Sequence, residues 1–304
     1  MAEQSKEIKR RIKSVSNIKQ ITRAMELVST SKLRKSRKQL ELTRPYYNTV
    51  ESSIREILAN TKGVKYDLLE RREVKNRLII VLTSDRGLAG GYNINVIRKA
   101  ESYIDDKVGT KFILVGVEAR EYFKRRYDGI VEEFSYISEE PSYNNAAKIG
   151  SICYDLYRKK EIDEVLLVYT HFSTVLSLVP SMVKLLPAES IEKEGNMENR
   201  LIEYEPSAEE VLNRLVKDYI SITIFGAMIE SAASEQASRR NSMKNATDNA
   251  NDMLESLSLR FNKAYLLIQN SDDMQINNDF ESLMLAGMMS QNLIYDNKKG
   301  ESDE

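Results

Sequence analysis

The chain has 304 residues, enough for one large domain or two ordinary ones. Hydrophobic residues make up 41% of it and charged residues 30%, which fits a small core with much solvated helix surface. Its single cysteine, Cys153, excludes an intrachain disulfide and a cysteine-based metal cluster, and its apolar helical setting indicates an inert core thiol. Because no apolar run approaches 18 residues and no signal-peptide core is present, we expect a cytosolic, soluble chain, with a peripheral place on a membrane complex still open.

The N-terminal segment reads as one helix of roughly 58 residues, a rod of roughly 80 to 90 Å. Its apolar residues recur at steps of mostly three and four, the period of a coiled-coil seam. The predicted seam runs through Ile8, Ile12, Val15, Ile18, Ile21, Met25, Val28, Leu33 and Leu40. Pro45 should bend or interrupt the helix, because proline removes a backbone donor and clashes with the preceding turn. The helical pattern then resumes from Val50, and Lys62-Gly63 is expected to end it.

This segment is strongly basic although the whole chain is nearly neutral. Between Met1 and Arg44, thirteen Lys and Arg residues face four Glu residues. Such a stripe is a solvated helix face, a contact for an acidic protein partner, or a contact for nucleic acid or anionic lipid.

The middle of the chain alternates strands and helices. The run 77–83 is rich in β-branched residues, as in strands buried on both faces of a parallel sheet. Further strands are expected at 111–116, 130–134, 164–170 and 174–186, with helices from 92 to about 107, through 122–123 and over 143–159. This order predicts an α/β fold, a Rossmann-like, three-layer domain with a mostly parallel sheet over residues 75–190.

A second long helix is predicted over 208–264, after a polar acidic loop. It would pair with the helix of residues 1–60 as a long coiled coil, the shape of a shaft. Its expected seam runs through Leu215, Ile222, Phe225, Ile229, Ala232, Gln236, Met243, Ala250, Leu254, Leu257 and Phe261. Many small residues between 226 and 238 would let helix backbones approach closely and leave a smooth surface.

Two features invite a catalytic or nucleotide-binding interpretation. The Gly-rich turn 84–93 follows a strand and opens a helix, where dinucleotide folds bind phosphate. Its spacing, however, is G-x-x-G-G, and no acidic residue ends the second strand, so a structural turn with a surface contact role is favoured. His171, the only histidine, has no readable nucleophile or acid partner and is interpreted as a hydrogen-bonded structural residue. We expect no catalytic residue, cofactor or metal.

Four motifs in order resemble the gamma subunit of rotary F-type ATP synthases. They are Ile18-Lys19-Gln20-Ile21-Thr22-Arg23-Ala24-Met25-Glu26-Leu27-Val28 with Ser31 to Lys35; Thr83 to Asn93; Tyr169 to Phe172; and Glu230 to Arg240 with Met243 to Ala250 and Asn262 to Ala264. Together they span about 260 residues.

The resemblance implies a rotating central stalk. The terminal helices would form an antiparallel coiled coil inside a ring of alpha and beta subunits, and the α/β domain would meet epsilon and the c-ring, with delta also in the complex. It implies a peripheral place on the cytoplasmic face of a bacterial cell membrane. Contact with acidic loops of beta is expected at Arg23, Met25, Lys32, Arg34 and Lys35. Contact with epsilon or the c-ring is expected at Ser84, Asp85, Arg86, Gly87, Gly90, Gly91, Tyr92 and Asn93. A nucleotide-dependent α/β enzyme with helical appendages and a basic coiled-coil nucleic-acid binder are the alternatives, although the resemblance implies no nucleic-acid partner.

The resemblance stops abruptly after Ala264. The family typically continues Arg-Gln-Ala-x-Ile-Thr, whereas this chain reads Tyr265-Leu266-Leu267-Ile268-Gln269 and then becomes polar. A shifted reading frame and true divergence both explain such a break. Residues 265–304 are therefore expected to be a divergent tail in which the second helix becomes irregular shortly after Ala264.

Overall fold

The computed structural model describes residues 2–60, 72–187, 205 and 207–269. The chain forms two compact units, one made of Met1–Ile21 with Ala246–Glu304 and the other of Thr22–Asn245. Helix α1 (Ala2–Asn60) and helix α5 (Ala208–Gln269) contribute to both units. Within the described residues, no helix has a stretch apolar and long enough to cross a membrane.

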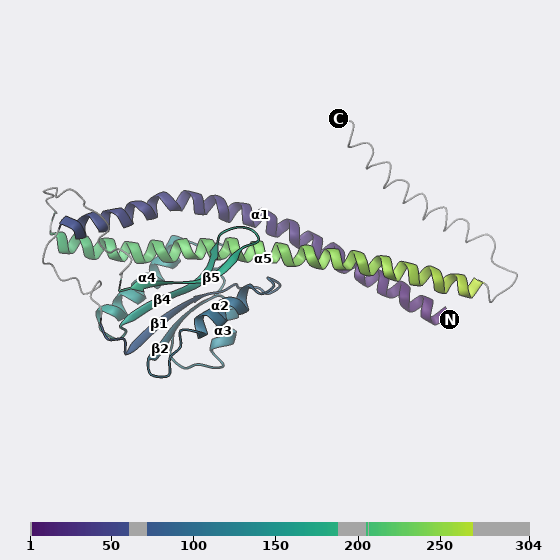
Figure 1. The fold of residues 1–304 in the computed structure, drawn as a ribbon, viewed down its shortest axis with the longest axis horizontal. Helices are drawn as coiled ribbons and strands as arrows, with labels where there is room; N and C mark the ends of the chain where they lie inside the picture. Colours follow the sequence, from purple (N-terminus) through teal and green to yellow (C-terminus); the bar gives the residue numbers. More distant parts are fainter. Residues whose placement is uncertain (1, 61–71, 188–204, 206, 270–304) are drawn as a thin grey trace, which may run out of the picture. The chain divides into compact units, whose positions relative to one another are not determined.

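A five-stranded sheet forms the centre of the Thr22–Asn245 unit (Figure 1). The strands are β1 (Asn76–Leu82), β2 (Gly109–Val115), β3 (Ile130–Phe134), β4 (Glu164–Phe172) and β5 (Leu178–Leu186). Their order is β3-β2-β1-β4-β5; β1 pairs in parallel with β2 and β4, β2 in parallel with β3, and β4 antiparallel with β5. The mostly parallel sheet is therefore confirmed, and the expected returning strand is β5.

Helices cover both faces of this sheet, which gives the expected three layers (Figure 1). Helix α2 (Tyr92–Glu101) and helix α3 (Val117–Phe123) pack on one face; α2 ends six residues before the predicted Lys107. Helix α4 (Tyr143–Arg158), α5 and the end of α1 pack on the other face. Side chains alternate along β1, so that Ile79 lies in the first core and Ile80 in the second.

The helices α1 and α5 run antiparallel in this unit. Leu33 clusters with Ala233 and Ala237, whereas the ring centroids of Tyr47 and Tyr219 lie 6.1 Å apart. Residues further along α1 therefore contact residues that lie earlier in α5.

The predicted α1 seam is wrong between Ile18 and Val28. In the Thr22–Asn245 unit the buried α1 positions are Thr22, Glu26, Ser29, Leu33 and Ser36, while Val28 is 55% exposed. In the other unit Ile18 and Ile21 are 49% and 60% exposed, and Ile8, Ile12 and Val15 are half-buried. The buried face keeps alternating steps of four and three, so the large apolar residues in the middle lie on the next face. On this face Leu33 packs against Ala233 and Ala237, small α5 side chains that allow close helix packing.

Pro45 does not interrupt α1, so of the two predicted effects, a bend or an interruption, the interruption is wrong. Helical residues follow it to Asn60, and Val50 and Ile54 are buried in the main core. Burial of these side chains, with the Tyr47–Tyr219 ring contact, favours helix strongly enough to offset the lost backbone hydrogen bond. The predicted end at Lys62-Gly63 lies outside the described residues.

Helix α5 continues past Ala264 to Gln269. The first five residues of the divergent segment are therefore helical, and the break in pattern does not end the helix at once. Residues 270–304, on which the rest of the tail prediction falls, lie outside the described residues.

Candidate functional site

The turn between β1 and α2 closes on itself through Ser84 and Asn93. Ser84 is fully buried, its backbone N–H donates to Asn93 Oδ1 at 3.0 Å, and Asn93 Nδ2 donates to Ser84 Oγ at 2.8 Å. Ser84 Oγ also donates to the carbonyl of Arg86 at 2.8 Å. These hydrogen bonds fix the shape of the turn and give partners to the polar groups that follow the end of strand β1.

Asp85 joins this turn to two other loops at the carboxyl ends of the strands. Its Oδ1 accepts from the backbone N–H of Tyr136 at 2.7 Å and of Val117 at 3.2 Å. Its Oδ2 accepts from the N–H and the hydroxyl of Ser138, at 3.0 and 2.7 Å. One carboxylate therefore holds together the turn, the start of α3 and the loop after β3.

A buried ion pair on α5 clamps the turn onto the long helix. Arg239 Nη1 lies 2.6 Å from Glu235 Oε1, and the two side chains are 7% and 0% exposed. Arg239 Nη2 donates to the carbonyls of Arg86 and Gly87, at 2.9 and 3.2 Å. Burial raises the pKa of Glu235 to about 6, and Arg239 opposes that rise. Because the guanidinium is shared between a carboxylate and two carbonyls, it connects α5 directly to the turn.

Small residues let the turn lie directly on the helix. Gly90 has φ +57°, a conformation that favours glycine, and a Cβ on it would lie 2.5 Å from Ser242 Oγ, so that the hydroxyl would have to move. Ser238 Oγ donates to the carbonyl of Ala89 at 2.6 Å, and Ser234 Oγ to that of Thr170 at 3.2 Å. The serines that looked like a smooth surface in the sequence are therefore hydrogen-bonding contacts to the α/β domain.

The loop after β3 ties the same domain to α1. Lys32 Nζ lies 2.8 Å from Glu139 Oε2, and Lys35 Nζ lies 2.9 Å from Glu140 Oε1. Lys35 lowers the pKa of Glu140, which is fully exposed. Gln39 Nε2 donates to a backbone carbonyl of the loop at 3.4 Å. Buried contacts to α5 and exposed ion pairs to α1 thus attach the α/β domain to both long helices.

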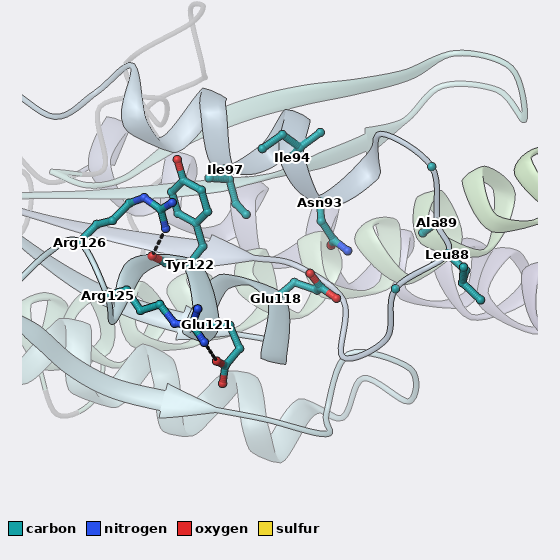
Figure 2. Close-up of a pocket in the computed structure, with 12 residues that line it drawn as sticks. Leu88, Ala89, Asn93, Ile94, Ile97, Glu118, Glu121, Tyr122, Arg125 and Arg126 are labelled. Atoms are coloured by element: carbon teal, nitrogen blue, oxygen red, sulfur yellow. Dashed lines mark hydrogen bonds and ion pairs between the residues drawn. The ribbon is translucent and has the colours of Figure 1, made fainter.

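A pocket of about 710 Å³ opens between α2 and α3, next to the turn (Figure 2). Its lining includes Glu118 and Glu121, which disfavour a phosphate. Its two arginines already have partners: Arg125 Nη2 lies 3.2 Å from Glu121 Oε2, and Arg126 Nη1 donates to the Tyr122 carbonyl at 3.0 Å (Figure 2). With two carboxylates in its lining and both arginines engaged, this pocket does not support the nucleotide-binding interpretation of the turn.

The remaining chemical groups have structural settings. His171 Nδ1 lies 2.7 Å from Glu230 Oε2, in keeping with the hydrogen-bonded role expected for it. Cys153 is fully buried, and burial raises the pKa of its thiol to about 12. In the part of the chain that the structure describes, no group of three or more His, Cys, Asp or Glu residues could hold a metal ion.

The residues expected to contact beta fall into two groups. Lys32 and Lys35 are bonded to the loop after β3, whereas Arg34 is exposed and Met25 is half-buried. Arg23, with 58% of its side chain exposed, lies 2.8 Å from Glu26. Basic stripe residues thus also have partners within the chain.

The residues expected to contact epsilon or the c-ring also divide. Ser84, Asp85, Tyr92 and Asn93 are engaged within the chain, and only Arg86, Gly87, Gly90 and Gly91 are exposed. Sequence reasoning missed the clamp of Glu235, Ser238 and Arg239. An Arg four residues after a Glu inside a run of small residues was the available signal, since both then lie on one crowded face.

The chain is similar in sequence to known ATP synthase gamma chains. The family model described as ATP synthase matches residues 4–265, so the match ends where the sequence loses the family pattern. The ATP synthase gamma chain of Alkaliphilus metalliredigens is 45% identical over 264 residues, covering 85% of this chain and 91% of that protein. The sodium ion specific gamma chain of Acetobacterium woodii is 40% identical, covering 87% and 93%.

A solved structure shares both fold and sequence with the chain. The central stalk and c-ring structure of the Tetrahymena thermophila mitochondrial ATP synthase contains a chain that is 27% identical, with a TM-score of 0.61, covering 74% of this chain and 99% of that one. Long matches at these identities, together with the two long helices attached to a mostly parallel sheet, establish that the chain belongs to the ATP synthase gamma-chain family.

Proposed function

We propose that the chain is the rotating central shaft of an ATP synthase and is not catalytic by itself. It would couple proton or sodium transport through the membrane sector to ATP synthesis or hydrolysis at beta subunits. The expected partners are the alpha, beta, epsilon and delta subunits and the c-ring, on the cytoplasmic side of a bacterial membrane. The family assignment and the helix pair support this proposal.

The attachment of the α/β domain to the helices is the observation that carries the mechanism. A shaft transmits torque only if the α/β domain cannot slip relative to the long helices. Arg239 bonds α5 to the turn after β1 through buried groups, and Lys32 bonds α1 to the loop after β3. Buried charge-assisted hydrogen bonds resist displacement more strongly than partly exposed ion pairs, so near the turn α5 would transmit more torque than α1. Val50 and Ile54 attach the end of α1 to the same domain through the main core.

The exposed basic residues of α1 would meet the acidic beta loops. Arg34 is exposed, and Arg23 is largely so, although it pairs with Glu26. Lys32 and Lys35 would have to be shared between beta and Glu139 and Glu140, since their amines already lie within 3 Å of those carboxylates. On the α/β domain, the exposed residues of the set expected to contact epsilon or the c-ring are Arg86, Gly87, Gly90 and Gly91.

Rotation of a single labelled position tests the proposal. Because Cys153 is the only cysteine and is buried, a Leu176→Cys variant carries one accessible thiol, on a side chain that is 88% exposed. A bead on this thiol, in a complex assembled with alpha and beta subunits, should turn in one direction when ATP is added. The unmodified chain is the control and should bind no bead.

Two results would refute the proposal. One is a bead that stays still while the assembled complex hydrolyses ATP normally. The other is robust ATP hydrolysis by the purified chain alone, which would restore the enzyme alternative.

A further inference from the structure

A second cavity lies on the opposite side of the sheet from α2 and α3, inside the Thr22–Asn245 unit. It has a volume of about 290 Å³ and is bounded by α1, by the β4–β5 face and by α5. Leu40 and Tyr47 of α1, Leu167 and Val183 of the sheet, and Ala227 of α5 provide apolar walls. A mostly apolar cavity of this size with a few polar groups is typical of a site for a small molecule.

Gly226 keeps the floor of this cavity open. It lies inside α5, where glycine is less favourable than alanine, yet a Cβ at this position would meet no atom within 4 Å. Its φ is not in the left-handed region, so neither conformation nor crowding requires glycine. The absent side chain leaves space that larger residues on this face of α5 would fill.

The polar groups of the cavity leave one cation without a partner. His171 and Glu230 pair with each other at 2.7 Å. Burial raises the pKa of Tyr169 to about 12, so its hydroxyl is a neutral donor at pH 7. Arg44 lines the cavity from α1 and is exposed, and no ion pair is recorded for it among the described residues. Among the described residues, Arg44 is thus a lining cation that no carboxylate pairs with, Glu230 is engaged with His171, and the walls are apolar.

We propose that this cavity binds a small amphipathic anion. The apolar body would pack between Tyr47 and Val183 above Gly226, and a carboxylate or sulfonate head would lie at Arg44. Such a ligand would bridge α1 to the sheet, two elements that both pack on α5, and would therefore bind only the folded unit. The site is separate from the turn clamp and from the rotor function proposed above.

Fluorescence titration with 8-anilinonaphthalene-1-sulfonate tests the proposal on the full chain. Its neutral analogue, N-phenyl-1-naphthylamine, reports on the apolar walls alone. We expect saturable binding of one sulfonate probe per chain. Arg44→Gln should weaken the sulfonate probe about threefold to tenfold and leave the neutral probe unchanged. Arg37→Gln, which removes an exposed α1 cation outside the cavity, is the matched control and should change neither.

Filling the cavity is the second arm. Gly226→Leu should weaken both probes more than tenfold, because its side chain enters open space, whereas Gly226→Ala adds one carbon and should bind almost normally. Equal weakening of the sulfonate probe by Arg44→Gln and Arg37→Gln would overturn the anion assignment. Unchanged binding of both probes to a folded Gly226→Leu chain would overturn the site itself. If that variant does not fold, the Arg44 and Arg37 pair decides.

Discussion

Replacing Arg239 by methionine removes the guanidinium of the clamp and keeps a side chain of similar length. Two losses follow. The carbonyls of Arg86 and Gly87 lose their donor, and Glu235, fully buried, loses the guanidinium with which it pairs. We expect the hydrogen bonds to the carbonyls to account for about 1–3 kcal/mol at any pH.

The second loss depends on pH, and its size follows from the pKa of Glu235. Burial already raises that pKa from 4.5 to about 6 with Arg239 present. Without the guanidinium the pKa rises further, so at pH 8 the variant must bury a neutral acid where the wild type buries a paired carboxylate. Between about pH 6 and pH 8 this difference grows to at most about 3 kcal/mol, at 1.36 kcal/mol per pH unit. At pH 5 the acid is neutral in both proteins and the difference disappears.

Urea unfolding at pH 8 and pH 5 measures both losses. Arg239→Met should destabilise the chain by up to about 4–6 kcal/mol at pH 8 and by about 1–3 kcal/mol at pH 5. The Glu235→Gln variant tests the direction of the pH dependence. Because the folded-state pKa of Glu235 is raised, its carboxyl contributes most to the free energy of unfolding below pH 4.5, and that contribution falls as pH rises through 6. In the Glu235→Gln background, Arg239→Met should show no such pH dependence. An equal effect at both pH values, or an unchanged pH dependence in that background, would show that Glu235 is not the group responsible.

Other changes have expected outcomes of known direction. Gly90→Ala should lower the free energy of unfolding in urea by about 2 kcal/mol or more, because its Cβ would lie 2.5 Å from Ser242 Oγ. Adding Ser242→Ala should restore part of that loss. Full stability of the Gly90→Ala variant would contradict the contact. Pro45→Ala should stabilise by about 1–3 kcal/mol, since the exposed proline lies inside a continuous helix, and a lower unfolding midpoint would argue for a real break there. Cys153 should react with a thiol reagent only after unfolding, since burial raises its pKa to about 12, and rapid labelling of the native chain would show that this core opens.

The α/β domain was predictable because its signal is local. Strands β1, β2 and β4 hold short apolar runs, and the weaker β3 was placed at its observed bounds from 130 to 134. The order of strands and helices then leaves few topologies. The end of α2 was missed because residues 102–107 hold polar groups that suit either a helix end or a turn.

The long helices were predictable as elements but not in their facing residues. Counting apolar residues assigned Ile21 and Val28 to the seam, whereas Thr22 and Ser29 are buried. Which face is buried depends on the partner helix, 200 residues away in sequence, as the clustering of Leu33 with Ala233 and Ala237 shows. The clamp was missed because charged residues are normally exposed, and the four-residue spacing of Glu235 and Arg239 places them on one helix face without showing that this face is fully buried.

The antiparallel pairing of α1 with α5 has a consequence for biosynthesis. Leu33 is made about 200 residues before Ala233 and Ala237, the residues with which it clusters. At about 5–20 residues per second, the ribosome leaves this part of α1 without its partner for about 10–40 s. During that time the strands of the α/β domain can pair with one another. Helix α1, however, has exposed isoleucine and leucine side chains until α5 is synthesised. We therefore expect newly made chains to depend on chaperones until α5 is released.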